Sequence, residues 1–129
     1  MPRVKISQAT ETAANLVLAI CGQVTFREDE IEHLCQRLEL DPFQLRELFE
    51  RAAAPAADIP VSHEAMPPAW YDNNVQISRL LLELNDILEF TKDDWQAVLE
   101  RAGLSQPEVV ELFQELWNQL ADAAKKYAT

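Results

Sequence analysis

Two short stretches, Arg101-Ala102-Gly103-Leu104-Ser105 and Arg37-Leu38-Glu39-Leu40-Asp41, decide how this chain folds. In the first stretch, Gly103 suits the left-handed residue that ends a helix, and Ser105 suits the N-cap of the next helix. The second stretch keeps an apolar residue at the same place and offers Asp41 as the N-cap, followed by a proline at the first helical position. Each stretch therefore predicts a tight turn between two helices.

The two turns belong to a longer repeat, in which residues 13–51 align without gaps with residues 77–115. Nine of the aligned positions are identical, and further apolar positions coincide. The identical pairs are Leu16/Leu80, Leu18/Leu82, Phe26/Phe90, Asp29/Asp93, Arg37/Arg101, Leu40/Leu104, Glu47/Glu111, Leu48/Leu112 and Phe49/Phe113. Because a duplicated unit keeps its apolar positions in register, the sequence predicts two similar units.

Each copy contains three segments with helical apolar spacing, and no segment shows convincing strand character. The first segment of each copy is apolar over most of its circumference, which predicts a central position. We therefore expect an all-α fold, a helical bundle of about six helices made of two pseudo-repeated three-helix, helix-turn-helix-like units that pack through their first helices. The chain 1–129 is predicted to be one compact domain, with repeat one at 7–54, a Pro-rich strap at 55–72 and repeat two at 73–127.

Capping residues predict where the later helices of each copy begin. Thr25 with Glu28, and Ser105 with Glu108, match the spacing of the capping box, in which a hydroxyl and a carboxylate satisfy the first backbone N–H groups. Thr91 is the corresponding N-cap in the second copy, although it lies two positions out of register with Thr25. The sequence thus predicts a helix start after each of these hydroxyl residues.

The third helix of each copy carries apolar residues that are predicted to complete the core. These residues are Phe43, Leu45, Leu48, Phe49 and Ala52 in the first copy, and Val109, Leu112, Phe113, Leu116, Trp117 and Leu120 in the second. Trp117 is expected in the core, with partial exposure at a subunit contact as the alternative. The last helix is expected to run to about Lys125, where a cation suits the helix C-terminus.

The strap at 55–72 contains four prolines, so it cannot be a continuous helix. We expect it to dock on the helices as an ordered strap, and a semi-rigid linker is the alternative. Trp70 and Tyr71 follow the last two prolines. They suit either fixing the strap to its own domain or anchoring a partner.

The charge balance restricts the function. The 129 residues include 22 Asp and Glu against 11 Lys and Arg, which gives a formal net charge of −11. Such a charge repels nucleic acid and anionic lipid and favours a basic partner or simple solubility. The N-terminus lacks the features of a signal peptide, and the apolar run at 16–21 is too short to span a bilayer. We expect a cytoplasmic protein in which Cys21 and Cys35 are free thiols, with a bridge between them as the less favoured reading.

The stretch 99–109 resembles the turn of helix-turn-helix proteins, with an apolar residue and a glycine at the usual spacing. The resemblance covers about twenty residues of each copy and implies a helix that could face DNA. In this chain the helix after the turn, 106–115, contains three acids and no cation. Since contacts to phosphate require clustered cations, direct binding of nucleic acid is not expected.

Residues for catalysis or metal binding are few. Glu30 and His33 have the Glu-x-x-His spacing of di-iron bundles, but the second copy has Ala97 where such a site needs another histidine. His63 lies in the Pro-rich strap, and no nucleophile at a suitable position accompanies it. The sequence predicts no enzyme, no catalytic residue, no metal site and no cofactor.

The residues favour a small, acidic, non-catalytic protein-binding module, such as an adaptor, a chaperone-like protein or a negative regulator. An acidic inhibitor that mimics nucleic acid and occupies a basic DNA- or RNA-binding protein is one alternative. A helix-turn-helix-like transcription regulator is the other. We expect a protein partner, possible homodimerisation and no membrane contact, and the predicted partner-binding residues are Trp70, Tyr71, Trp117, Glu108, Glu111 and Glu115.

Overall fold

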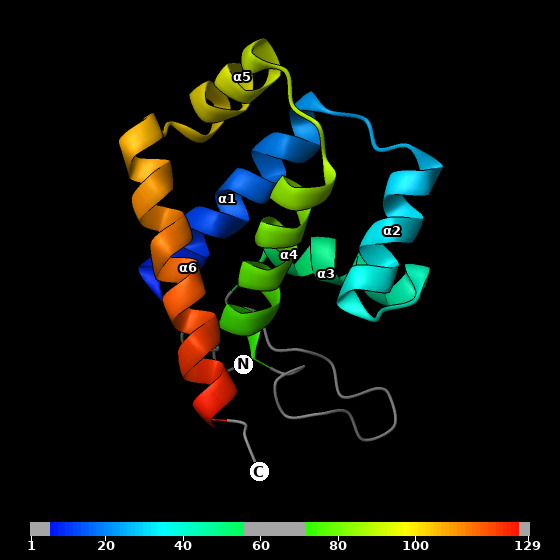
Figure 1. The fold of residues 1–129 in the computed structure, drawn as a ribbon, viewed down its shortest axis with the longest axis vertical. Helices are drawn as coiled ribbons and strands as arrows, with labels where there is room; N and C mark the ends of the chain where they lie inside the picture. The colour runs from blue at the N-terminus through cyan, green and yellow to red at the C-terminus, as the bar shows by residue number, and fades with distance from the viewer. Residues whose placement is uncertain (1–5, 56–71, 127–129) are drawn as a thin grey trace.

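Local caps and apolar spacing produce six α-helices in the part of the chain that the structure describes, residues 6–55 and 72–126 of a computed structural model (Figure 1). In chain order they are α1 (Gln8–Gln23), α2 (Glu28–Leu38), α3 (Pro42–Ala53), α4 (Asn73–Ile87), α5 (Lys92–Ala102) and α6 (Gln106–Lys126). No strand occurs in these described residues. The prediction of an all-α bundle of six helices is therefore confirmed.

Side chains cap the helices at several of the predicted positions. At the start of α5, the Thr91 hydroxyl accepts the backbone N–H of Asp94 at 3.0 Å, and Asp41 caps α3 in the same way. At the start of α6, the backbone N–H of Ser105 donates to Glu108 Oε1 at 3.0 Å. These bonds satisfy backbone N–H groups that have no partner within the helix.

The predicted start of α2 is wrong. Arg27 occupies the N-cap in place of Thr25, and its backbone N–H donates to Glu30 Oε1 at 2.9 Å. The Glu30 carboxylate accepts a hydrogen bond from a backbone N–H one turn earlier and so fixes the helix start at Arg27. A cap by the Thr25 hydroxyl would have placed the start two residues earlier. With this correction the N-caps Arg27 and Thr91 stand at matching positions of the sequence repeat.

The turns that join α2 to α3 and α5 to α6 have the same backbone form. In the second turn Leu104 N–H donates to Leu99 O at 3.0 Å, and the first turn has the equivalent bond at the same length. The residue after the helix is left-handed in both, with φ of 57° at Glu39 and 69° at Gly103. Glycine adopts this conformation freely, whereas another residue there costs about 1–2 kcal/mol.

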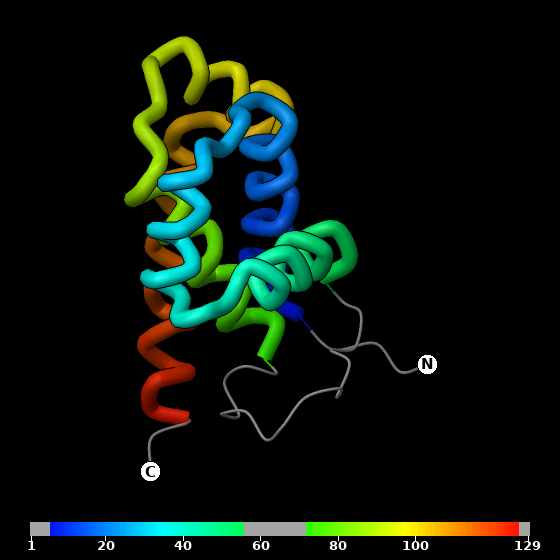
Figure 2. The backbone as a smooth tube through the Cα atoms, turned by 90° about the vertical axis from the view of Figure 1, so that its right-hand side faces the viewer, coloured from blue at the N-terminus to red at the C-terminus, as the bar shows by residue number. Residues whose placement is uncertain are grey.

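Helices α1 and α4 contact each other and form the centre of the bundle (Figures 1 and 2). Helix α1 also contacts α3, α5 and α6, and α4 also contacts α2, α3 and α6. The larger apolar side chains with no exposed surface are Leu16, Val17, Ile20, Leu48, Ile77, Leu80, Leu81, Val98 and Leu116. Burying each such side chain contributes about 1.5–3 kcal/mol to folding, and this core explains why the first helix of each half needs a wide apolar face.

The outer helices cross between the two halves of the chain. Helix α2 packs against α4, and α5 packs against α1. Arg37 of α2 fastens the first of these contacts, with its guanidinium 2.8 Å from Glu83 and 3.0 Å from Asp86 of α4. At the second contact the guanidinium of Arg101 lies over the backbone of Gly22 in α1. The halves therefore interleave, and the prediction of two repeated three-helix units stays a prediction.

A buried polar cluster joins α1, α4 and α6. Asn74 Oδ1 accepts the Thr10 hydroxyl at 2.8 Å and the Ser7 backbone N–H at 2.9 Å. The Gln119 amide nitrogen donates to Ser78 Oγ at 3.0 Å and to Thr10 Oγ1 at 3.2 Å, and Gln119 Oε1 also contacts the Ser7 hydroxyl. Because these hydrogen bonds link residues of three helices, the cluster holds the N-terminal ends of α1 and α4 against α6.

Two residues that were predicted to be buried lie at the surface. Trp117 is 61% exposed and Phe43 is 60% exposed. The apolar stripe of each of these helices, α6 and α3, is therefore wider than the part of the helix that the rest of the bundle buries. Cys21 and Cys35 are free, so the less favoured bridge between them is not formed. Most of the predicted strap lies outside the described residues.

Candidate functional site

Residues of α1, of the start of α2 and of α3 line an apolar groove. Figure 2 shows α3 running across the lower part of α1. We call the groove the α1–α3 groove. Its volume is about 540 Å³. Its lining consists of Leu18 and Cys21 of α1, Phe26 of the loop before α2, Ile31 of α2, and Pro42, Leu45, Arg46, Phe49, Glu50 and Ala53 of α3. Eight of these ten side chains carry no charge, so the groove offers an almost continuous apolar surface.

The floor of the groove is built from aromatic rings that are anchored in the bundle. The rings of Phe26 and Phe49 lie 5.8 Å apart between centroids, and both pack against the core. Above them, Leu18 is 43% exposed and Ile31 is 37% exposed. Large apolar side chains that are fixed from below and open above are typical of a surface that another molecule covers.

The charged residues of the groove neutralise each other. Arg46 lies 3.7 Å from Glu50, one helical turn further along α3. Helix α2 adds the exposed carboxylates of Glu28 and Glu32, and neither has an ion pair among the described residues. The surface of α2 on either side of the groove residue Ile31 along the chain is therefore negative.

Cys21 places a thiol at the edge of the groove. The side chain is exposed, yet the surrounding apolar groups withdraw it partly from water, and this desolvation raises the pKa of the Cys21 thiol above its ordinary value. A thiol with a raised pKa is a weak nucleophile at neutral pH. Cys21 therefore serves as part of an apolar lining and as a chemical reporter of whether the groove is covered.

The three predicted glutamates meet in a second groove. Glu108, Glu111 and Glu115 are exposed on α6 and follow each other at helical spacing. They line a groove of about 500 Å³ between α6 and the start of α1, together with Ser7, Gln8, Ala9, Thr12, Leu104, Leu112 and Gln119. Two hydrogen bonds from Ser105, one from its backbone N–H and one from its hydroxyl, lower the pKa of Glu108. The structure thus brings these residues together into a negative groove, which we call the α6 acidic groove.

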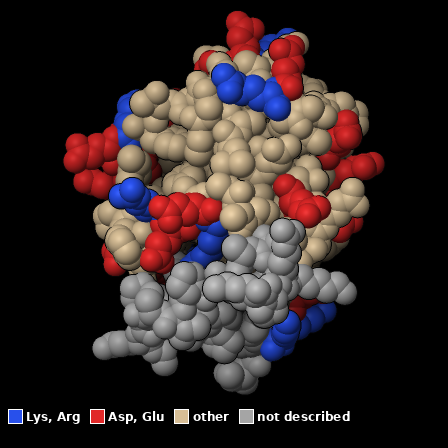
Figure 3. Space-filling model, turned by 180° about the vertical axis from the view of Figure 1, so that it is seen from behind, with Lys and Arg blue, Asp and Glu red and all other residues tan. Residues whose placement is uncertain are grey.

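The predicted aromatic residues do not join the acidic groove. Trp117 is exposed on α6, two turns after the equally exposed Val110, and lines neither groove. Trp70 and Tyr71 lie outside the described residues. The back of the molecule shows carboxylates on both flanks and also nearer the middle of the face, with a few Lys and Arg side chains among them (Figure 3).

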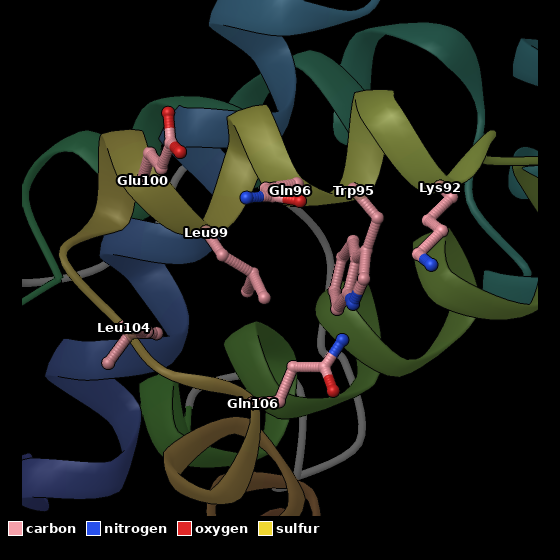
Figure 4. Close-up of a pocket in the computed structure, with 7 residues that line it drawn as sticks. All are labelled: Lys92, Trp95, Gln96, Leu99, Glu100, Leu104 and Gln106. Carbon is pink, nitrogen blue, oxygen red and sulfur yellow. The ribbon is translucent and has the colours of Figure 1, made fainter.

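A third, smaller pocket of about 350 Å³ lies beneath α5. Figure 4 shows Trp95 and Leu99 pointing from α5 towards Gln106 at the start of α6, with Leu104 on the connecting turn. The Trp95 ring also packs against Phe90, with 5.2 Å between ring centroids. This pocket has a mixed lining, and its polar groups do not converge on one point (Figure 4).

Sequence reasoning missed the α1–α3 groove. The available signal was Leu18, which lies off the main apolar stripe of the first helix. Such a residue is buried or exposed according to where the neighbouring helices lie, and this arrangement is a tertiary property. Among the described residues, no group of three metal-ligating side chains lies close enough to hold an ion, and no helix there is long and apolar enough to cross a bilayer.

Comparison with protein families, with curated proteins and with solved structures yields no match for this chain.

Proposed function

We propose that this protein is a non-catalytic protein-binding module that holds an apolar helix of a partner protein in the α1–α3 groove. The observation that carries the proposal is the groove itself, in which Leu18 and Ile31 stand exposed above a floor of Phe26 and Phe49. An apolar groove between helices suits the helix-in-groove mode of recognition, in which residues at i, i+3, i+4 and i+7 of the partner insert together.

A defined peptide tests this proposal. The probe is a fluorescent 16-residue amphipathic peptide with leucine on one face and glutamine on the other. Binding should move the amide NMR signals of residues around the groove, and Ile31→Lys should weaken the affinity by about tenfold or more, because it places a charge in the apolar contact. Val110→Lys is the matched control, since Val110 is an exposed apolar residue outside the groove. A peptide that binds elsewhere, or binds both variants equally, would contradict the proposal.

The α6 acidic groove favours a second candidate, an inhibitor that imitates nucleic acid. Its support is the row of Glu108, Glu111 and Glu115 on one face of α6. Such a protein should bind a basic nucleic-acid-binding protein in a salt-sensitive way and be displaced by DNA. Replacing the three glutamates by glutamine should abolish this binding. Competition that persists in the triple variant would refute this candidate.

We also infer that the fold is a tandem duplication of one three-helix unit. Support comes from helices, caps and turns that recur at an offset of 64 residues: α2 and α5, the N-caps Arg27 and Thr91, the left-handed residues Glu39 and Gly103, and the first residues of α3 and α6. The hydrogen-bonded residues Thr10 and Asn74 also occupy equivalent positions. In a duplicated pair of units, equivalent residues meet at the axis that relates the two copies.

The duplication makes the contacts of Arg37 and Arg101 equivalent, and this can be tested. Asp86, a partner of Arg37, corresponds to Gly22 beneath Arg101. The substitution Gly22→Asp should therefore create an ion pair with Arg101. A double-mutant cycle with Arg101→Ala should show a coupling of roughly 0.5 kcal/mol, as is usual for exposed pairs. A coupling of zero or of opposite sign would contradict the equivalence.

A further inference from the structure

We infer that the helix bound in the α1–α3 groove is basic, with lysine or arginine side chains flanking its apolar face. This inference rests on the proposed function and adds the charge of the partner to it. The apolar lining explains why a helix would bind, and the charges around the lining distinguish one class of helix from another.

In residues 8–53, every arginine is either paired with a carboxylate or buried. Residues 8–53 hold nine Asp and Glu against four Arg and no Lys. Three of these arginines are already held by carboxylates of this chain, Arg27 by Asp29 at 3.3 Å, Arg37 by Glu83 and Asp86, and Arg46 by Glu50. The fourth, Arg51, is only 8% exposed. Within residues 8–53, a partner with acidic flanks would therefore meet only arginines that are paired or buried. Arg101 of α5 lies by Gly22 at the end of α1, but no residue of α5 lines the groove.

Two carboxylates without an ion pair among the described residues lie next to the groove residue Ile31 on α2. Glu28 lies one turn before Ile31 on the same face of the helix, and Glu32 directly follows Ile31 and lies one turn after Glu28. Both are exposed, and neither has an ion pair among the described residues. A helix lying in the groove would carry its flanking residues past these two carboxylates.

The size of the expected effect follows from the exposure of these groups. Exposed ion pairs contribute little individually, roughly a twofold to fivefold gain in affinity for each contact. Two contacts then give about a tenfold preference for a lysine-flanked peptide over a neutral one. Because the carboxylates are solvated, raising the salt concentration should reduce this preference.

Three 16-residue peptides test the inference. They share the same leucine face and carry lysine, glutamine or glutamate on the polar face. Their affinities are measured by fluorescence anisotropy at low and high salt, and occupancy of the groove is read from the rate at which Cys21 is alkylated. We expect the lysine peptide to bind about tenfold more tightly than the glutamine peptide and the glutamate peptide to bind most weakly. Each bound peptide should slow the alkylation of Cys21.

Two charge variants locate the effect. Glu28→Gln combined with Glu32→Gln removes the carboxylates next to Ile31, and Glu89→Gln combined with Asp122→Asn removes the same charge from exposed positions that line neither groove. The first pair should remove most of the preference for lysine without changing the affinity for the glutamine peptide. The second pair is the matched control and should leave the preference within about twofold of the wild type.

The possible failures are distinguishable. If all three peptides protect Cys21 with equal affinity, the groove binds helices and the inference of a basic partner is wrong. If the two double variants reduce the preference equally, the effect comes from the net charge of the protein and the inference is also wrong. If no peptide protects Cys21, the proposed function fails as well.

Discussion

The substitution Asn74→Ala probes the contact that joins α1 to α4 at their N-terminal ends. Asn74 Oδ1 accepts two hydrogen bonds, from the Thr10 hydroxyl at 2.8 Å and from the Ser7 backbone N–H at 2.9 Å. Thr10 is completely buried, and Ser7 is the N-cap of α1 and half-buried. The substitution therefore leaves two donors without their acceptor, and water reaches only one of them readily.

The expected loss of stability is about 2–4 kcal/mol. A buried donor without a partner costs about 1–3 kcal/mol, and the half-buried Ser7 N–H contributes the lower part of that range. A domain of this size has a free energy of unfolding of about 5–15 kcal/mol, so the loss is a substantial fraction of the whole. The unfolding midpoint should fall by roughly 8–16 °C.

Urea unfolding followed by circular dichroism and by tryptophan fluorescence measures this loss. The m-value should not change, because the surface exposed on unfolding stays the same. Asn85→Ala, an exposed position on α4, is the control and should stay within about 0.5 kcal/mol of the wild type. A double-mutant cycle with Thr10→Ala should show coupling, since the two side chains are bonded directly. If Asn74→Ala matches the control, the cluster does not stabilise the bundle and the reasoning is refuted.

Four further substitutions test other parts of the structure. Residues 39 and 103 both have a left-handed backbone, which glycine adopts freely. Gly103→Ala should therefore destabilise the protein by about 1 kcal/mol, and Glu39→Gly should stabilise it by roughly 0.5 kcal/mol. Denaturant midpoints that move in the opposite directions would contradict this. The lowered pKa of Glu108 means that its hydrogen bonds favour folding above its ordinary pKa and lose this effect as the pH falls through the lowered value. Ser105→Ala removes the hydroxyl bond to Glu108 and keeps the backbone one, so in an NMR titration it should raise that pKa part of the way towards its ordinary value, and an unchanged titration would show that the hydroxyl does not contribute. Leu80→Ala, at a position with no exposed surface, should cost about 3–5 kcal/mol in calorimetry or denaturant unfolding, and a cost below 1 kcal/mol would be inconsistent with its central position.

The sequence alone determined the helices and most of their ends. A cap acts within three or four residues, as Thr91, Asp41 and Ser105 do, so its effect can be predicted without the rest of the fold. The error at α2 has the same local origin, because Thr25 and Arg27 are alternative N-caps only two residues apart. The Glu30 carboxylate selects Arg27 over Thr25, and both were visible in the sequence.

Among the predicted site residues, the three glutamates of α6 are the ones whose relative positions follow from the sequence. Glu108, Glu111 and Glu115 share a helix, and helical spacing alone puts them on one face. The groove that they line also needs the start of α1, which is about a hundred residues away in the sequence. Trp117 shows the limit of the same reasoning, because its apolar stripe predicted burial and the structure exposes it.

The tertiary structure decided which apolar surface stays open. Leu16 and Leu18 are both leucines of α1, yet the first is completely buried and the second is 43% exposed. The difference arises because α4 and α5 cover one side of α1 while α3 crosses the other and leaves a groove beside it. A periodic pattern in the sequence shows which face of a helix can be buried. Which part of that face is actually buried depends on helices that are distant in the chain. The candidate binding site therefore exists only in the folded bundle.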